Sequence, residues 1–226
     1  MIPRFLGTAI MAATLFAAAS PASAGSINVY AIPSGEIEDA VMAVSDKLAE
    51  LGMESFPKSG HAIHATLYLT DYSDDAIADL KTTVEAIAAD WSRFPLTARG
   101  IEVTPSNWVF VGIEKTNDLQ RLADQVVLAA APLRDQSVAA PAWMQNFPDK
   151  LPAFERYGSP NVFEQFSPHF TLLANEDSPN LQAFVAWAKE AKPTATGSVV
   201  GIGIGRADAN GQIEEILAEY RFGGSN

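Results

Sequence analysis

Apolar residues recur along the first half of the chain with spacings that separate strands from helices. Residues 26–32 alternate between apolar and polar and stop at a proline, which is typical of a strand. Between Ile37 and Leu51 the apolar side chains return every three or four residues, which predicts a helix that ends at Gly52. The first half is therefore predicted to hold a strand at 26–32, a helix at 37–51, a strand at 61–70, a helix at 77–87 and a strand at 94–103.

The second half repeats this order. A strand at 108–114 precedes a helix from about residue 118, and a strand at 167–173 precedes a helix that Ser178-Pro179 should open. Asn210-Gly211 predicts a hairpin turn between two last strands at 198–206 and 213–222. The duplicated pattern predicts an α+β fold.

The two halves differ in length between their first helix and their second strand. The extra residues, about 24 of them, fall within Pro132–Gln165, a stretch dense in proline and aromatic side chains. Such a composition predicts an ordered loop, and long ordered loops often cover active sites. The sequence leaves two interpretations open, a lid over a site or a packed surface excursion.

Two short motifs share the same spacing of histidine and threonine. They are His64-Ala65-Thr66-Leu67 and His169-Phe170-Thr171-Leu172, and they hold two of the three histidines in the chain. On a strand, side chains two apart share a face, so each histidine is predicted to lie beside its threonine. The leucines and Phe170 should face the other way.

A pair of imidazoles and a pair of hydroxyls suit phosphoester chemistry. Histidine gives and takes protons near neutral pH, and opening a cyclic phosphodiester needs one base and one acid. Hydroxyl donors stabilise charge on phosphoryl oxygens. The alternative is that His64 and His169 are buried strand histidines without catalytic work, with Thr66 and Thr171 chosen for strand propensity.

With two such motifs, the chain resembles the 2H phosphoesterase superfamily over residues 26–222. That group includes cyclic nucleotide phosphodiesterases and 2′-5′ RNA ligase-like proteins. The resemblance implies a bilobal domain over residues 25–226, in which two pseudo-symmetric small antiparallel sheets with outer helices surround a central cleft. It implies His64 and His169 as general acid and base, Thr66 and Thr171 as phosphate ligands, and no metal or cofactor. Which histidine is acid and which is base stays open.

Other residues near the motifs have weaker indications. Tyr68 is expected on the face of His64 and Thr66, where it could stack on a substrate ring, although core packing is an equal alternative. Side chains that could supplement phosphate binding are Lys58, Lys115 and Arg206. The glycines of Gly201-Ile-Gly-Ile-Gly205 lack the spacing of a dinucleotide loop, so we interpret them as structural.

Residues 1–24 have the features of a cleavable signal peptide. Arg4 precedes an uncharged apolar run, and Ala22-Ser23-Ala24 is a typical cleavage site. We therefore expect a periplasmic or secreted protein that leaves the membrane after cleavage. Loss of Arg4 changes the net charge from −12 to −13, which disfavours long nucleic acids but permits a small phosphorylated substrate. Cysteine is absent, so neither disulfides nor thiolate catalysis enter. A monomer is the default expectation.

The leading hypothesis is metal-independent hydrolysis of a small cyclic phosphodiester of the 2′,3′-cyclic nucleotide kind. One alternative is 2′-5′ RNA ligase-like end processing, which the negative charge and the export signal disfavour. Another is an exported protein that binds a phosphorylated ligand without turnover, which would not require both histidines.

Overall fold

The computed structural model describes residues 25–223, so the expected signal peptide lies outside the described residues. Seven antiparallel strands form one open sheet in the order β2-β1-β6-β3-β4-β5, and β7 also pairs with β6. The strands are β1 Gly25–Pro33, β2 Ala65–Tyr72, β3 Phe94–Val103, β4 Val109–Ile113, β5 His169–Leu173, β6 Thr194–Ala207 and β7 Ile213–Arg221. The helices are α1 Gly35–Glu50, α2 Ile77–Ala89, α3 Asn117–Ala130, α4 Leu151–Tyr157 and α5 Leu181–Ala191.

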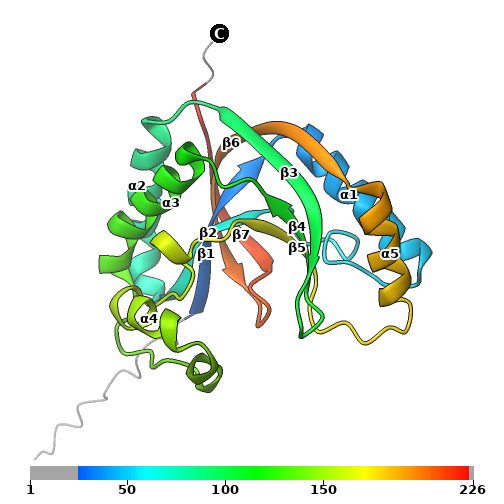
Figure 1. Cartoon of the computed structure of the whole chain (residues 1–226). Helices are drawn as coiled ribbons and strands as arrows, with labels where there is room; N and C mark the ends of the chain where they lie inside the picture. Colours follow the sequence, from blue (N-terminus) through cyan, green and yellow to red (C-terminus); the bar gives the residue numbers. More distant parts are fainter. Residues whose placement is uncertain (1–24, 224–226) are drawn as a thin grey trace, which may run out of the picture.

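Strand β6 belongs to two halves of the sheet at once. Its first part pairs with β3, from Thr194 to Val199, whereas its later part lies between β1 and β7. Two four-stranded sheets, β2-β1-β6-β7 and β6-β3-β4-β5, are therefore continuous through β6 (Figure 1). The predicted mixed fold with antiparallel sheets is confirmed, but the two sheets share a strand.

The two sheets do not correspond to the two halves of the sequence. Strand β3 comes from the first half and joins the sheet of β4 and β5, while β6 from the second half joins β1 and β2. Each sheet is likewise covered by one helix from each half of the sequence. Helices α2 and α3 pack against β2, β6 and β7, whereas α1 and α5 pack against β6 and β3, on the other side in Figure 1.

Helix α1 shows how the predicted apolar stripe forms the core. Ile37, Val41, Val44 and Leu48 follow each other at steps of three or four residues and are all buried. Burying each of these side chains contributes about 1.5–3 kcal/mol before the entropy of ordering is counted. The stripe thus packs α1 against the sheet, as its spacing predicted.

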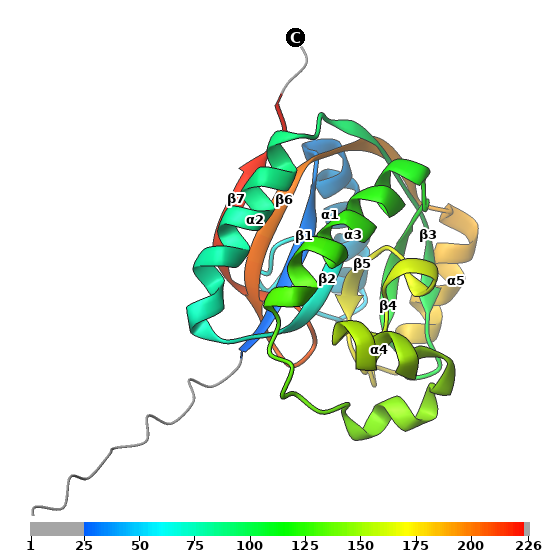
Figure 2. The same ribbon diagram turned by 90° about the vertical axis from the view of Figure 1, so that its left-hand side faces the viewer.

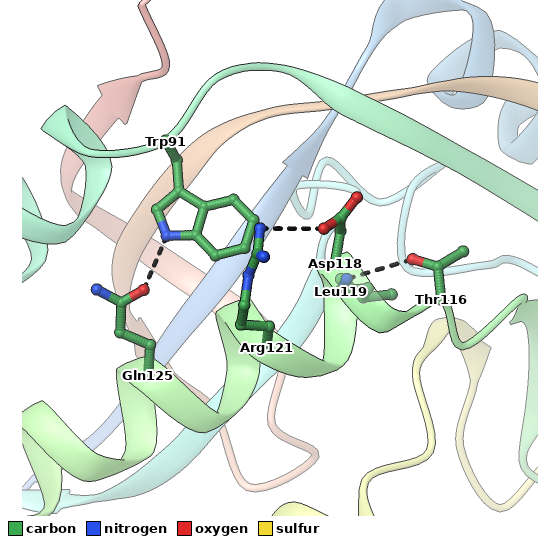
Figure 3. A network of polar contacts seen from close by, with 6 residues as sticks. All are labelled: Trp91, Thr116, Asp118, Leu119, Arg121 and Gln125. Atoms are coloured by element: carbon green, nitrogen blue, oxygen red, sulfur yellow. Dashed lines mark hydrogen bonds and ion pairs between the residues drawn. The ribbon is translucent and has the colours of Figure 1, made fainter.

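A polar network ties the start of α3 to the turn before β3 (Figure 3). The Trp91 indole donates to Gln125 Oε1 at 2.9 Å, and the Arg121 guanidinium lies 4.7 Å from the centre of the indole. Thr116 Oγ1 accepts from the Leu119 N–H at 3.2 Å and so caps the helix. These contacts fix α3, and α3 in turn supports β2.

Helix α5 begins later than its sequence signal predicted. Ser178-Pro179 forms a turn before the helix, in which Ser178 Oγ accepts from the Asn180 N–H at 3.1 Å. The first helical residue is Leu181, two positions further on than expected.

The extra stretch between α3 and β5 is ordered and mostly helical. It contains α4 and four short 3₁₀ turns, Ala131–Leu133, Ala142–Asn146, Pro148–Lys150 and Phe163–Gln165, which lie below α3 in Figure 2. Backbone hydrogen bonds join it to β2, since the Asp135 N–H donates to the Asp71 carbonyl at 2.8 Å. Trp143 and Phe147 remain about half exposed, with 51% and 48% of their surface accessible. Among residues 25–223, no helix has the length and apolar character needed to cross a membrane.

Candidate active site

Both motif histidines are held by the same local contact. His64 Nδ1 lies 2.9 Å from the carbonyl oxygen of Ala62, and His169 Nδ1 lies 2.8 Å from that of Ser167. A carbonyl oxygen only accepts, so each Nδ1 carries the proton. In the neutral imidazole, Nε2 is then the nitrogen with a free lone pair. The duplicated sequence thus gives a duplicated tautomer.

His64 lies just before β2 and is 5% exposed. The Tyr30 ring packs edge-on against it, with ring centroids 5.5 Å apart, and Asn28 Nδ2 lies 3.2 Å from its Nε2. Burial lowers the pKa of His64 below the ordinary histidine value, and the nearby charge of His169 lowers it further, although the hydrogen bonds to the backbone of Ala62 and Gly211 oppose this. The net shift favours the neutral imidazole.

His169 begins β5 in a more open place. Its ring lies against Phe110 of β4, with centroids 4.0 Å apart. Burial again lowers its pKa, while the bond to Ser167 and the charge of Glu102 raise it and the charge of Lys150 lowers it. The second histidine thus has charged neighbours of both signs, one from β3 and one from the extra stretch.

The sheet brings the two motif strands together. Strands β2 and β5 are the two ends of the strand order, yet they contact each other. His64 also lies close enough to His169 for the two charges to interact. Thr66 Oγ1 accepts from Asn28 Nδ2 at 2.8 Å, and Thr171 is paired with Phe110 in the register of β4 and β5. Leu67, Leu172 and Phe170 face away into the core, as alternation predicted.

Tyr68 does not lie on the face of β2 that carries His64. The predicted stacking of Tyr68 on a substrate ring is therefore wrong, and its alternative, packing in the core, is what the structure has. Val29 pairs with Tyr68 and Tyr30 pairs with Thr66, so Leu67 is an extra residue in β2. One extra residue reverses which face the following side chains use. Tyr68 is consequently 1% exposed, and its hydroxyl donates to the Tyr157 carbonyl of α4.

The glycine run in β6 makes room for the first histidine. A side chain at Gly203 would overlap the ring of Tyr30. One at Gly201 would collide with the backbone of β7, and one at Gly205 would collide first with the side chain of Ile213. The structural interpretation of these glycines is confirmed. Tyr30 can occupy its place beside His64 because residue 203 has no side chain.

The three basic residues considered for phosphate binding are occupied elsewhere. Lys58 pairs with Asp46, and Lys115 Nζ donates to the Phe166 carbonyl at 3.0 Å. Arg206 pairs with Asp74 at 2.7 Å and with Glu215 at 3.3 Å. The cation that acts on His169 is Lys150, which sequence reasoning missed.

Asn28 and Phe110 are further site residues that sequence reasoning missed. Asn28 is the one amide side chain in the first strand, and alternation places it on the face opposite Ile27 and Val29. A buried amide in a strand could have indicated a site residue. Nothing in the sequence pointed to Phe110 in this way, because aromatic residues are common in strands. Within residues 25–223, no three histidine, aspartate or glutamate side chains form a group that could hold a metal ion.

The model of the 2′-5′ RNA ligase superfamily matches residues 38–211 of the chain. The chain belongs to this superfamily. Membership confirms the resemblance seen in the motifs and places the chain among enzymes that process phosphoesters. No curated protein sequence matches the chain.

Solved structures share the fold at low sequence identity. Protein TT0787 of Thermus thermophilus superposes with a TM-score of 0.58 at 15% identity, over 89% of this chain and 100% of that one. E. coli LigT in its apo form gives 0.52 at 15% identity, over 90% and 99%. LigT in complex with 3′-AMP gives 0.51 at 16%, with the same coverage. At these identities the structures establish the fold alone.

Proposed function

We propose that the chain hydrolyses a small cyclic phosphodiester of the 2′,3′-cyclic nucleotide kind without a metal. His64 and His169 would together serve as the general acid and the general base, and Thr66 and Thr171 would bind the phosphate. The observation that carries this proposal is the matched pair of Nδ1 contacts, at 2.9 and 2.8 Å. A shared tautomer leaves both Nε2 atoms as the nitrogens that exchange protons with substrate and water.

The reaction needs both nitrogens. One neutral imidazole takes a proton from water as its oxygen attacks phosphorus, and the other, as imidazolium, gives a proton to the ribose oxygen as the P–O bond breaks. Threonine hydroxyls donate to the phosphoryl oxygens where charge accumulates. The LigT structures with phosphate and 3′-AMP support a phosphorylated ligand of this size.

The superfamily name favours one alternative, the joining or processing of 2′-5′ RNA ends. The net charge of −12 for the whole chain disfavours a long polyanion. A third candidate is an exported protein that binds such a ligand without turnover. These three functions share a site and differ in what happens to the ligand.

The decisive test is a panel of the four 2′,3′-cyclic nucleotides, with a strong chelator present throughout. His64→Ala and His169→Ala should each lower turnover about 10²–10⁴-fold. The double variant should lose far less than the product of the two, because the residues act as a unit. His61→Ala is the matched control, since it removes the remaining histidine outside the motifs.

Each alternative has its own outcome. Joining of RNA ends without cyclic nucleotide opening would favour the ligase, and saturable binding without turnover would favour the binding protein. Activity that disappears with chelator and returns with one divalent ion would refute the metal-independent mechanism. Near-normal turnover in either single histidine variant would refute the paired roles.

We also propose that the protein is exported to the periplasm or secreted as a monomer. The sequence of residues 1–24 supports this proposal. Mature protein should begin at or near Gly25, which N-terminal sequencing of exported material would test. Exported material that still begins at Met1 would contradict cleavage.

A further inference from the structure

Asn28 of β1 touches both members of the first motif. Its side chain is fully buried, and its Nδ2 atom lies 3.2 Å from His64 Nε2 and 2.8 Å from Thr66 Oγ1. The same atom lies 3.2 Å from the carbonyl oxygen of Gly211, in the turn between β6 and β7. One amide group thus connects the histidine, the threonine and a distant turn.

The Gly211 carbonyl decides which way the amide points. A carbonyl oxygen only accepts hydrogen bonds, so the atom facing it must be the amide nitrogen and not the oxygen. The two hydrogens of that nitrogen are shared among three acceptors, which are the Gly211 carbonyl, Thr66 Oγ1 and the lone pair of His64 Nε2. A protonated Nε2 would place a hydrogen against those of the amide, so the contact with Asn28 favours neutral His64 and opposes the Gly211 backbone, which raises the pKa of His64.

The same nitrogen also sets the direction of the Thr66 hydroxyl. Thr66 Oγ1 accepts from Asn28 Nδ2, so a lone pair is used and the hydroxyl hydrogen remains available. A hydroxyl that must donate to a phosphoryl oxygen is best prepared in this way. The amide therefore prepares one base and one donor together.

The second motif has no counterpart to this amide. Its threonine is paired across the strands with Phe110, and its histidine stacks on the same ring. Within residues 25–223 the Thr171 hydroxyl makes no hydrogen bond. The two motifs are equal in sequence, but only the first has an amide that opposes protonation of its histidine.

Asn28 keeps this position at a cost to stability. Its Oδ1 atom is buried and has no hydrogen-bond partner among the described residues. An apolar side chain in β1 would avoid the loss of hydration that such an atom suffers. A buried residue with an unmet acceptor is better explained by what its nitrogen does than by packing.

We propose that Asn28 is a positioning residue that reserves His64 as the general base and directs the Thr66 hydroxyl, which leaves His169 as the general acid. The base and acid roles rest on the proposed function, whereas the effect of Asn28 on His64 does not. The titratable groups around His64 are Tyr30 of β1, His61 of the preceding loop and His169 of β5. Glu219 lies beyond the Tyr30 hydroxyl, at 3.4 Å from it.

The first measurement follows protonation of His64 directly by NMR, which three histidines make straightforward. Asn28→Asp replaces the donors with a carboxylate, so the pKa of His64 should rise by about 1–3. The control Asn180→Asp makes the same change on the surface, where this amide only donates to the Leu51 carbonyl. An unchanged His64 titration in folded Asn28→Asp protein would overturn the proposal.

The second measurement connects this shift to catalysis. In Asn28→Asp the acid limb of the kcat/KM profile should move to higher pH by the amount seen in the His64 titration. Movement of the alkaline limb, or no movement, would overturn the base role. Absence of turnover in the wild type would refute the proposed function and the base role with it, while the NMR result still decides the effect of Asn28.

A variant with the same branched heavy-atom skeleton separates positioning from packing. Asn28→Leu should lower kcat/KM about 10–100-fold through the loss of His64 and Thr66 alignment, yet unfold at the same or a higher urea concentration than the wild type. A fall in kcat/KM that is matched by loss of folded protein would instead assign Asn28 a structural role and overturn the proposal.

Discussion

The ring of Phe110 lies against the imidazole of His169, with centroids 4.0 Å apart and planes inclined by 32°. No residue in the first motif is stacked this closely, since Tyr30 meets His64 edge-on at 5.5 Å. So close a contact between the two rings restricts rotation of the imidazole. It therefore adds a second restraint to the hydrogen bond between His169 Nδ1 and the Ser167 carbonyl.

Phe110→Leu should lower kcat/KM about 2–10-fold, because an aromatic pair contributes roughly 0.5–1.5 kcal/mol beyond buried area. Steady-state kinetics on the substrate identified by the panel would measure the effect. Trp108→Leu is a suitable control, since Trp108 lies 6.1 Å from the Phe110 ring. Equal effects of the two substitutions would contradict a specific role for stacking.

Two charged neighbours should move the pKa of His169 in opposite directions. The negative charge of Glu102 raises this pKa and the positive charge of Lys150 lowers it. Glu102→Gln should therefore lower the pKa of His169, and Lys150→Gln should raise it, each by less than about one because both charges are near solvent. NMR titration of His169 measures both. Shifts of the same sign would show that a structural change, not charge, is responsible.

Gly203→Ala should destabilise the protein, because the new methyl group would overlap the Tyr30 ring. Overpacking of this kind costs about 1–3 kcal/mol. Since Tyr30 packs on His64, turnover should fall as well. Gly35→Ala is the matched control, because no heavy atom lies within 4 Å of a side chain added there. Urea unfolding of both variants would test the difference, and equal midpoints would contradict it.

Tyr68→Phe should lower the free energy of unfolding by about 1 kcal/mol and leave KM unchanged. The hydroxyl donates to the Tyr157 carbonyl, and burial raises its pKa, so it stays a donor. Tyr72→Phe removes a comparable bond to the Ala130 carbonyl and should behave alike. If KM rises in the Tyr68 variant and not in the Tyr72 variant, the core-packing interpretation is contradicted and a contact between Tyr68 and the substrate is supported.

The sequence predicted the elements well because their apolar patterns are local. The strand at Phe94–Val103 was predicted to the residue, and the helix of Ile37 and Leu48 within a few positions. The histidines could be found because the same short motif occurs twice, once where β2 begins and once where β5 begins. A local pattern is sufficient where one face of an element is buried.

What could not be predicted depends on pairing between distant strands. The side on which Tyr68 lies follows from an extra residue in β2, and its partner in register is Val29, 39 positions away. Lys150 lies close enough to lower the pKa of His169 because of the path of the extra stretch, which no periodicity describes. Asn28 was visible as an isolated polar residue, but its contact with His64 required the register of β1 and β2.

The exchange of strands between the two sheets has a consequence for how the chain acquires its structure. The sheet that contains His64 is completed by β6, whose residues 194–207 lie near the end of the chain. A fragment ending at Val103 would keep β2 beside β1 but lack β6, and a fragment beginning at Thr104 would lack β3 between β6 and β4. Neither half is an independent folding unit, despite the repeat. Pairing such as Val29 with Ile204 joins the ends of the chain, and contacts this distant in sequence form slowly. The nascent polypeptide must therefore be almost fully synthesised before either histidine strand belongs to a finished sheet.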